Sequence, residues 1–283
     1  MLATGQSNHE KFKKYFKDND TAKIISLLTE WESSDPSDPE LYTSAINFYF
    51  SQSKRETISI EQEKPTNKSF ELTDSSGAVV GYLGSRLGFD PKIIGLVIKY
   101  ADKGIEKFPD RLDIRFGKCY ILGRVEDFEH FTKEIIKTVQ YSVVINNNWF
   151  WAENKKIDDG ENFMLDAIQE YLKQLFNTGD DNLLVKMQQI GDTTIKYYPN
   201  NVEILSTTAV AYTITKNYDK ALAYLMDAEE INPKDFIVLN NIAQAYKLKG
   251  DKVNAIRYYE LTEKYGDKEA KKQARENISS LRR

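Results

Sequence analysis

The stretch that decides the fold runs from residue 201 to residue 259 and contains one pattern twice. The first copy reads NVEILSTTAVAY (201–212) and then ALAYLMDAEEINP (221–233), and the second reads FIVLNNIAQAY (236–246) and then AIRYY (255–259). Each residue of the second copy follows its equivalent by 34 positions, as Leu239 follows Leu205 and Ala243 follows Ala209. A fixed period of this length predicts a repeated structural unit.

Each copy has the spacing of two short helices. Apolar residues recur every three or four positions, and brief polar turns at 215–217 and 249–251 separate the two halves. Short turns place neighbouring helices antiparallel, and small residues such as Ala209 and Ala221 let their backbones approach closely. Pro233 ends one unit because it has no N–H to donate and disfavours helix at the residue before it. A single helical hairpin cannot bury both faces, so stacking must complete the core.

This pattern of a large residue, a small residue and an aromatic residue at fixed offsets resembles the tetratricopeptide repeat. The resemblance implies an all-α, right-handed superhelix of stacked helix–turn–helix units. The expected core of residues 201–266 is Leu205, Ala209, Tyr212, Ala221, Leu225, Leu239, Ala243, Tyr246, Ala255 and Tyr259. Gly191, before the first clear copy, stands where the family usually has a bulky residue.

One segment interrupts the helical period. Thr57–Glu61 and Ser69–Thr73 alternate apolar and polar residues, and Asp74-Ser-Ser-Gly is a turn signal before Ala78–Leu83. Such alternation predicts a small antiparallel hairpin or three-stranded meander inserted at 54–88. Strands are expected only between about 55 and 84, with the insertion packed mainly on the neighbouring first helices and one edge strand left uncovered.

The whole chain can be divided on these signals. The predicted order is an N-terminal helix pair (1–37), a repeat carrying the β insertion (38–111), a repeat (112–145), an aromatic connecting loop (146–160), a degenerate repeat (161–200), two repeats (201–235 and 236–266) and a capping helix (267–283). In the connecting loop, Trp149-Phe150-Trp151 either fills a gap between repeats or contacts a partner, and the first interpretation is favoured.

Composition excludes several classes of protein. A net charge of −4 gives no basic footprint for nucleic acid, and no apolar run is long enough for a transmembrane segment. One cysteine cannot form an internal disulfide. Residues 1–6, MLATGQ, are too short for a secretory signal, although they fit the tail of a trimmed one. The compartment therefore stays open: cytoplasmic by default, or exported or periplasmic if a signal peptide precedes Met1.

No catalytic, metal or cofactor site is predicted. Cys119 occupies the small, helix-contacting position of its repeat, where a buried inert thiol is favoured over a nucleophile. His9 and His130 lack a metal-ligand spacing, and there is no phosphate loop, nucleophile elbow or dinucleotide fingerprint.

The resemblance places partner-binding residues on the concave surface formed by the first helix of each repeat. Counting along those helices gives Tyr42, Tyr49, Phe116, Tyr120, Arg124, Asn240, Gln244 and Lys247 as groove residues. A second interpretation packs some of the aromatic residues under the inserted sheet, and both interpretations remain open. Asn241 matches one asparagine of the family's carboxylate clamp, but Ser206 and Val210 depart from it, so a C-terminal carboxylate ligand is not favoured.

The function predicted from these features is a non-catalytic scaffold that binds a protein or peptide partner in its groove. One alternative is an enzyme with its site in the β insertion or the 146–160 loop. Another is a structural subunit of an envelope or secretion assembly.

Overall fold

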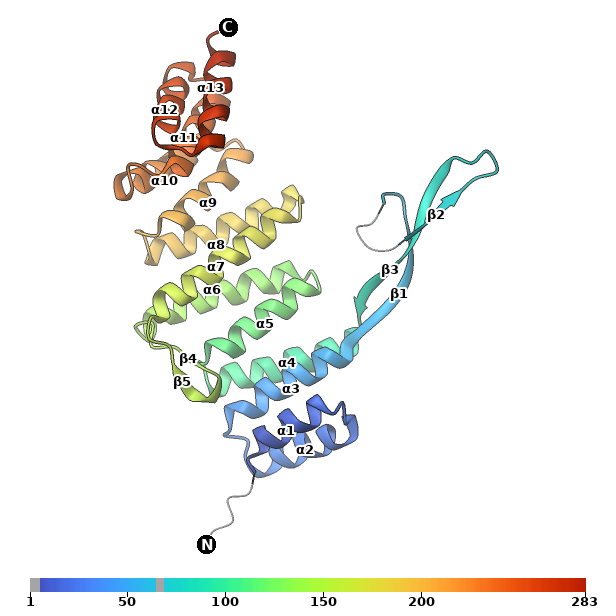
Figure 1. Cartoon of the computed structure of the whole chain (residues 1–283). Coiled ribbons are helices and arrows are strands. Elements are labelled where there is room, and N and C mark those ends of the chain that lie inside the picture. The colour runs from blue at the N-terminus through green and yellow to red at the C-terminus, as the bar shows by residue number, and fades with distance from the viewer. Residues whose placement is uncertain (1–5, 65–68) are drawn as a thin grey trace. The chain divides into compact units, whose positions relative to one another are not determined.

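The computed structural model describes residues 6–64 and 69–283, and the chain forms two compact units. One unit extends to Asp127 and includes Phe150–Lys156, and the other comprises Phe128–Trp149 and Ile157–Arg283. Helices dominate both, as Figure 1 shows. The predicted all-α class with a small β insertion is confirmed.

The first unit packs five helices around one apolar core. They are α1 (Asn8–Lys17), α2 (Thr21–Ser34), α3 (Pro39–Ser53), α4 (Pro91–Lys107) and α5 (Leu112–Arg124). Asp20, Asp38 and Asp90 cap α2, α3 and α4 by accepting backbone N–H groups at the helix starts. The core centres on Trp31, which is fully buried together with Leu41 and Ala101. Gly104 brings α4 close to α3, because a Cβ there would lie 3.0 Å from the Cβ of Tyr42.

The insertion is a three-stranded antiparallel sheet, here called the arm. It consists of β1 (Lys54–Glu61), β2 (Ser69–Thr73) and β3 (Val79–Phe89) in the order β1–β3–β2, so β3 is central. β1 continues directly from α3, and only Asp90 separates β3 from α4. The Asp90 N–H donates to the Ser53 carbonyl at 2.7 Å and closes the base of the arm (Figure 1).

A second, smaller sheet was not expected. β4 (Phe150–Trp151) and β5 (Lys155–Lys156) form a tight antiparallel pair around the short 3₁₀ turn Ala152–Asn154. The expectation that strands occur only between 55 and 84 is therefore wrong. Glu153 and Asn154 adopt left-handed backbone conformations, which reverses the chain within this turn.

The second unit is a succession of helices: α6 (Phe128–Val144), α7 (Gly160–Asn177), α8 (Leu184–Tyr197), α9 (Val202–Ile214), α10 (Tyr218–Ile231), α11 (Phe236–Lys249), α12 (Lys252–Tyr265) and α13 (Lys268–Leu281). A 3₁₀ turn, Asp181–Leu183, precedes α8. From α8 onward, each helix packs on the next one in the chain. Asn201, Asn217, Asp235, Asp251 and Asp267 cap the five helices from α9 to α13.

The expected core of residues 201–266 is confirmed, and no strand occurs in this fully described range. Every predicted core side chain is buried except Tyr246, which is half-buried and stacks on Tyr258 at 5.9 Å between ring centroids. Gly191, which stands where the family usually has a bulky residue, has a physical cause. A Cβ at Gly191 would lie 2.0 Å from Thr208 Oγ1, so α8 and α9 are too close there for any side chain.

Candidate functional site

The arm has one apolar face. In an antiparallel sheet, directly opposed residues point to the same side. Ile60, Leu83 and Phe70 are opposed across β1, β3 and β2 and form one row. The face, named here the apolar arm face, consists of Ile58, Ile60, Phe70, Leu72, Leu83 and Leu87.

This face is largely exposed. Ile58, Ile60 and Phe70 are 80%, 72% and 77% exposed. The expectation that the insertion packs mainly on the neighbouring helices is therefore wrong. The physical reason is the connection: β1 continues α3 and β3 leads into α4 with no loop long enough to fold the sheet back.

Aromatic residues join the arm to the helices. Phe50 of α3 stacks on Phe89 of β3 with ring centroids 5.4 Å apart, and Tyr120 of α5 meets Phe50 edge-on at 5.9 Å. The Lys54 ammonium lies 5.9 Å from the Phe50 ring centroid, within range of a cation–π interaction. Tyr120 remains 54% exposed. Phe50, Phe89 and Tyr120 are named here the aromatic base.

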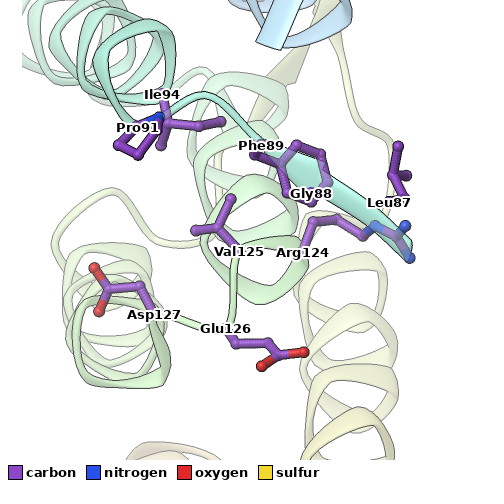
Figure 2. Close-up of a pocket in the computed structure, with 9 residues that line it drawn as sticks. All are labelled: Leu87, Gly88, Phe89, Pro91, Ile94, Arg124, Val125, Glu126 and Asp127. Atoms are coloured by element: carbon purple, nitrogen blue, oxygen red, sulfur yellow. The ribbon is translucent and has the colours of Figure 1, made fainter. Parts of the chain in front are cut away.

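A hollow of about 480 Å³ lies beside the aromatic base. It is lined by Leu87, Gly88, Phe89, Pro91, Ile94, Arg124, Val125, Glu126 and Asp127. Figure 2 shows Arg124 from the end of α5 alongside the last residues of β3. Its volume is within the range of sites for small ligands, and its lining combines apolar walls with one cation and the two carboxylates of Glu126 and Asp127.

The structure brings together two of the predicted groove residues and buries two others. Tyr120 and Arg124 lie at the base of the arm. Tyr42 is 1% exposed and donates its hydroxyl to the Pro36 carbonyl at 2.9 Å, and Phe116 is 7% exposed. The prediction of both as groove residues is corrected, since helix counting placed on the surface two side chains that α3 and α5 turn into the core.

Tyr49 is half-buried and packs within the first unit. Its ring stacks on Tyr100 at 5.6 Å, and the Tyr100 hydroxyl donates to Glu32 at 2.9 Å. Burial raises the pKa of Tyr49, with a smaller contribution from the Glu32 carboxylate. This residue therefore supports the aromatic packing behind the site.

The remaining three predicted residues lie on α11 in the second unit. Gln244 accepts a hydrogen bond from the Tyr259 hydroxyl at 2.7 Å, and Lys247 donates to Asn277 at 2.8 Å. Asn240 is half-buried on the same helix. Gln244 and Lys247 thus already have partners within their own unit.

Sequence reasoning missed the exposure of the arm. The alternation at Ile58/Ile60 and Phe70/Leu72 predicted one apolar face, but alternation cannot tell a face that packs inside from one that faces solvent. Phe89 and Leu87 carried no separate signal, since both lay past the predicted end of the strands.

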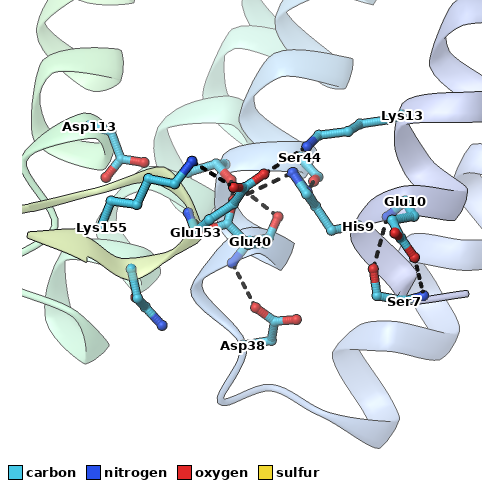
Figure 3. Close-up of polar contacts among 12 residues, drawn as sticks. Ser7, His9, Glu10, Lys13, Asp38, Glu40, Ser44, Asp113, Glu153 and Lys155 are labelled. Carbon is cyan, nitrogen blue, oxygen red and sulfur yellow. Dashed lines mark hydrogen bonds and ion pairs between the residues drawn. The ribbon is translucent and has the colours of Figure 1, made fainter. Parts of the chain in front are cut away.

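The 150–156 turn is fixed by a buried ion cluster rather than open to a ligand. Arg111 is 1% exposed and donates to Glu40 at 2.8 Å and to Asp113 at 2.7 and 2.8 Å. Burial lowers the pKa of Arg111, but Asp113 and Glu40 outweigh it and leave the pKa above its ordinary value. Asn154 accepts from the same guanidinium, and the Glu153 N–H donates to Glu40 Oε1 at 2.7 Å, as Figure 3 shows around Glu40.

Trp149, the first residue of the Trp-Phe-Trp stretch, is completely buried in the second unit, with its ring 5.9 Å from that of Tyr141. Trp151 is 36% exposed. Adjacent residues in extended backbone point to opposite faces, so the three aromatics cannot all face one way.

These observations define a protein of paired helices with a β arm. Within that class, residues 203–235 match the family model described as tetratricopeptide repeat. The resemblance predicted from the sequence is confirmed over residues 203–235, which carry a tetratricopeptide repeat.

Solved structures similar to this chain are themselves proteins of that family. YrrB, described as a TPR protein with an unusual peptide-binding site, is 12% identical over 88% of this chain and 97% of its own, with a TM-score of 0.44. The C-terminal part of a TPR repeat-containing protein from Cytophaga hutchinsonii is 16% identical over 96% of this chain and 95% of its own, with a TM-score of 0.41. The TPR2AB domain of yeast Sti1, solved as a complex with pHSP90, is 11% identical over 98% of this chain and 97% of its own, with a TM-score of 0.34.

No curated protein matches the chain in sequence. Among the described residues, no helix combines the length and the apolar character needed to cross a membrane.

Proposed function

We propose that this protein is a non-catalytic scaffold that binds a protein partner through the apolar arm face and the aromatic base. The observation that carries the proposal is the row Ile60–Leu83–Phe70, in which both outer side chains are more than 70% exposed. An exposed contiguous apolar patch marks an interaction site more often than a neutral surface.

Burial on a partner would stabilise a complex substantially. Moving a large apolar side chain fully from water into an interface contributes about 1.5–3 kcal/mol. Tyr and Arg are the residue types that most often dominate binding energy, and Tyr120 and Arg124 stand at the base of the arm. A partner with an apolar side chain for the hollow fits this surface, whose charged lining consists of Arg124, Glu126 and Asp127.

The charged groups of the 150–156 turn support a structural role. Hydrogen bonds from Lys155 and Lys13, at 2.9 Å each, lower the pKa of Glu153 to about 2. Glu40 and Asp113 are both bonded to Arg111. A general acid at neutral pH needs a raised pKa, so Glu153 is unsuited to that task.

The proposal is tested by capture of partners from the source cell, followed by an affinity measurement with the purified partner. The comparison is between the full chain and a chain in which residues 55–86 are replaced by a short Gly/Ser turn. We expect the replacement to abolish binding while α9–α13 unfold cooperatively at an unchanged temperature. Native affinity in the replaced chain would show that the arm is only structural.

A further inference from the structure

The two outer strands of the arm differ in how their edges are protected. β3 lies between β1 and β2, so within the described residues each outer strand has one strand neighbour. β2 has five residues and a register irregularity between Leu72 and Thr73. β1 has eight residues, lacks proline and keeps an even register along its whole length. Short strands and bulges prevent pairing with other chains, whereas a long regular edge invites it.

We infer that the β1 edge pairs with β1 of a second copy of this chain, antiparallel about a two-fold axis at Ile58. In that register, residues equally distant from Ile58 stand opposite one another on the same face of the sheet. Arg55 then faces Glu61 of the second copy, and Glu61 faces its Arg55, so symmetry provides two ion pairs. Thr57 and Ser59 are opposed in the same way. The inference goes beyond the proposed function, because it concerns how two copies assemble.

Neighbouring registers lack this charge complementarity within β1. A register centred on Thr57 places Arg55 opposite Ser59 and Lys54 opposite Ile60. One centred on Ser59 pairs only residues 57–61 of β1 with β1. It would place Arg55 opposite Glu63, but Glu63 lies beyond the end of β1, and Lys54 would face Lys64. Opposite charges directly across an antiparallel pair favour a register, and like charges oppose it.

Both charged groups are accessible for this pairing. The Arg55 side chain is 52% exposed, and its ion pair with Asp90 is long, at 3.4 Å. Its guanidinium also donates to the Gln52 and Lys54 carbonyls at 3.0 Å, and pairing must compete with these two bonds. Glu61 accepts from the hydroxyl of Ser59 at 3.1 Å and is only partly covered. Pairing would join the two arms into a six-stranded sheet with one continuous apolar face.

A symmetric cross-link tests the register. Opposed residues of an antiparallel pair have Cα atoms roughly 4.5–5.5 Å apart, within the range of about 4.4–6.8 Å that a disulfide spans. Ile58→Cys should therefore form a disulfide with itself across the two-fold axis. Ile60→Cys is the matched control, on the same strand and face and similarly exposed. Its two copies would lie four residues apart along the strands, on the order of 13 Å.

Under mild oxidation of the full chain, we expect at least tenfold more dimer with Ile58→Cys than with Ile60→Cys. Analytical ultracentrifugation of the unmodified chain should show a monomer–dimer equilibrium. Arg55→Glu should raise the dimer Kd about tenfold or more, and the exchange Arg55→Glu with Glu61→Arg should restore it. Circular dichroism confirms that each variant is folded.

Three results would overturn the inference. Equal cross-linking at both positions would indicate non-specific association through the apolar arm face. A chain that stays monomeric in ultracentrifugation, with no excess of dimer from Ile58→Cys, would show that the edge does not pair with itself. An Arg55→Glu variant that dimerises normally would remove the proposed register. None of these results affects binding at Phe70, which lies on β2 away from this edge.

Discussion

At the scale of single residues, Gly191 shows how closely α8 and α9 approach. An added Cβ would lie 2.0, 2.5 and 2.8 Å from Oγ1, Cγ2 and Cβ of Thr208. The Thr208 hydroxyl also donates to the Ile204 carbonyl at 2.6 Å, which holds the side chain in place. The clash between an added Cβ and Thr208 could be removed only if α8 or α9 moved.

Gly191→Ala should lower the free energy of unfolding by about 1–3 kcal/mol, because overpacking outweighs the helix propensity gained. Thermal and denaturant unfolding measure the change. The second substitution Thr208→Ala should recover part of the loss, since it removes the two shortest contacts. The control Gly95→Ala, in a helix with nothing within 4 Å, should be neutral or stabilising by up to ~1 kcal/mol. A stable Gly191→Ala variant would contradict this packing.

Tyr120 is expected to contribute to partner binding rather than to the stability of the fold. Tyr120 is 54% exposed, and its ring meets the Phe50 ring edge-on at 5.9 Å. Tyr120→Ala should weaken partner binding by more than ~1 kcal/mol and shift the melting temperature little. Phe116→Ala, which empties a buried position of the same helix, should instead lower the free energy of unfolding by about 3–5 kcal/mol. An unchanged affinity for Tyr120→Ala would remove this residue from the site.

At the scale of elements, the 150–156 turn depends on one buried cation. Arg111→Met would leave Glu40 and Asp113 without their shared partner, and removing one member of a buried pair costs about 3–5 kcal/mol. We expect a lower melting temperature and faster hydrogen exchange at the amides of residues 150–156. Arg111→Lys, which keeps the charge but loses the bidentate geometry, should be intermediate. Unaltered exchange in Arg111→Met would show that the turn is held by other contacts.

The helices were predictable from sequence because their signals are local. The 34-residue offset, the short polar turns and the small residues at contacts identified the helices and core of 201–266. The boundaries assigned to the other repeats stay a prediction. The arm's alternation predicted its strands and its apolar face. The exposure of this face depends on how the chain leaves α3 and enters α4. No local sequence pattern predicts that geometry.

The candidate site was harder to predict than the fold. Counting along a helix placed Tyr42 and Phe116 on the surface, whereas each packs in a core formed by distant elements. Tyr120 and Arg124 were found by the same count, but their neighbours Phe89 and Leu87 come from the insertion. A site assembled from helices and an inserted sheet lies outside what a repeat pattern specifies.

At the scale of the whole molecule, two helical units account for the stability of the chain, and the arm accounts for the proposed binding. The arm contributes little burial to its own unit, since its apolar face is mostly in water. An apolar face left in water in this way favours contact with a partner.

The most direct test of this account is the Kd of the purified partner for Phe70→Ser. Phe70 is 77% exposed, so its replacement should not alter the folding of the chain. We predict that the Kd rises at least tenfold, while Glu71→Ala, the adjacent residue on the opposite face of β2, changes it less than twofold. An unchanged Kd for Phe70→Ser, or an equal loss in both variants, would contradict binding through the apolar arm face.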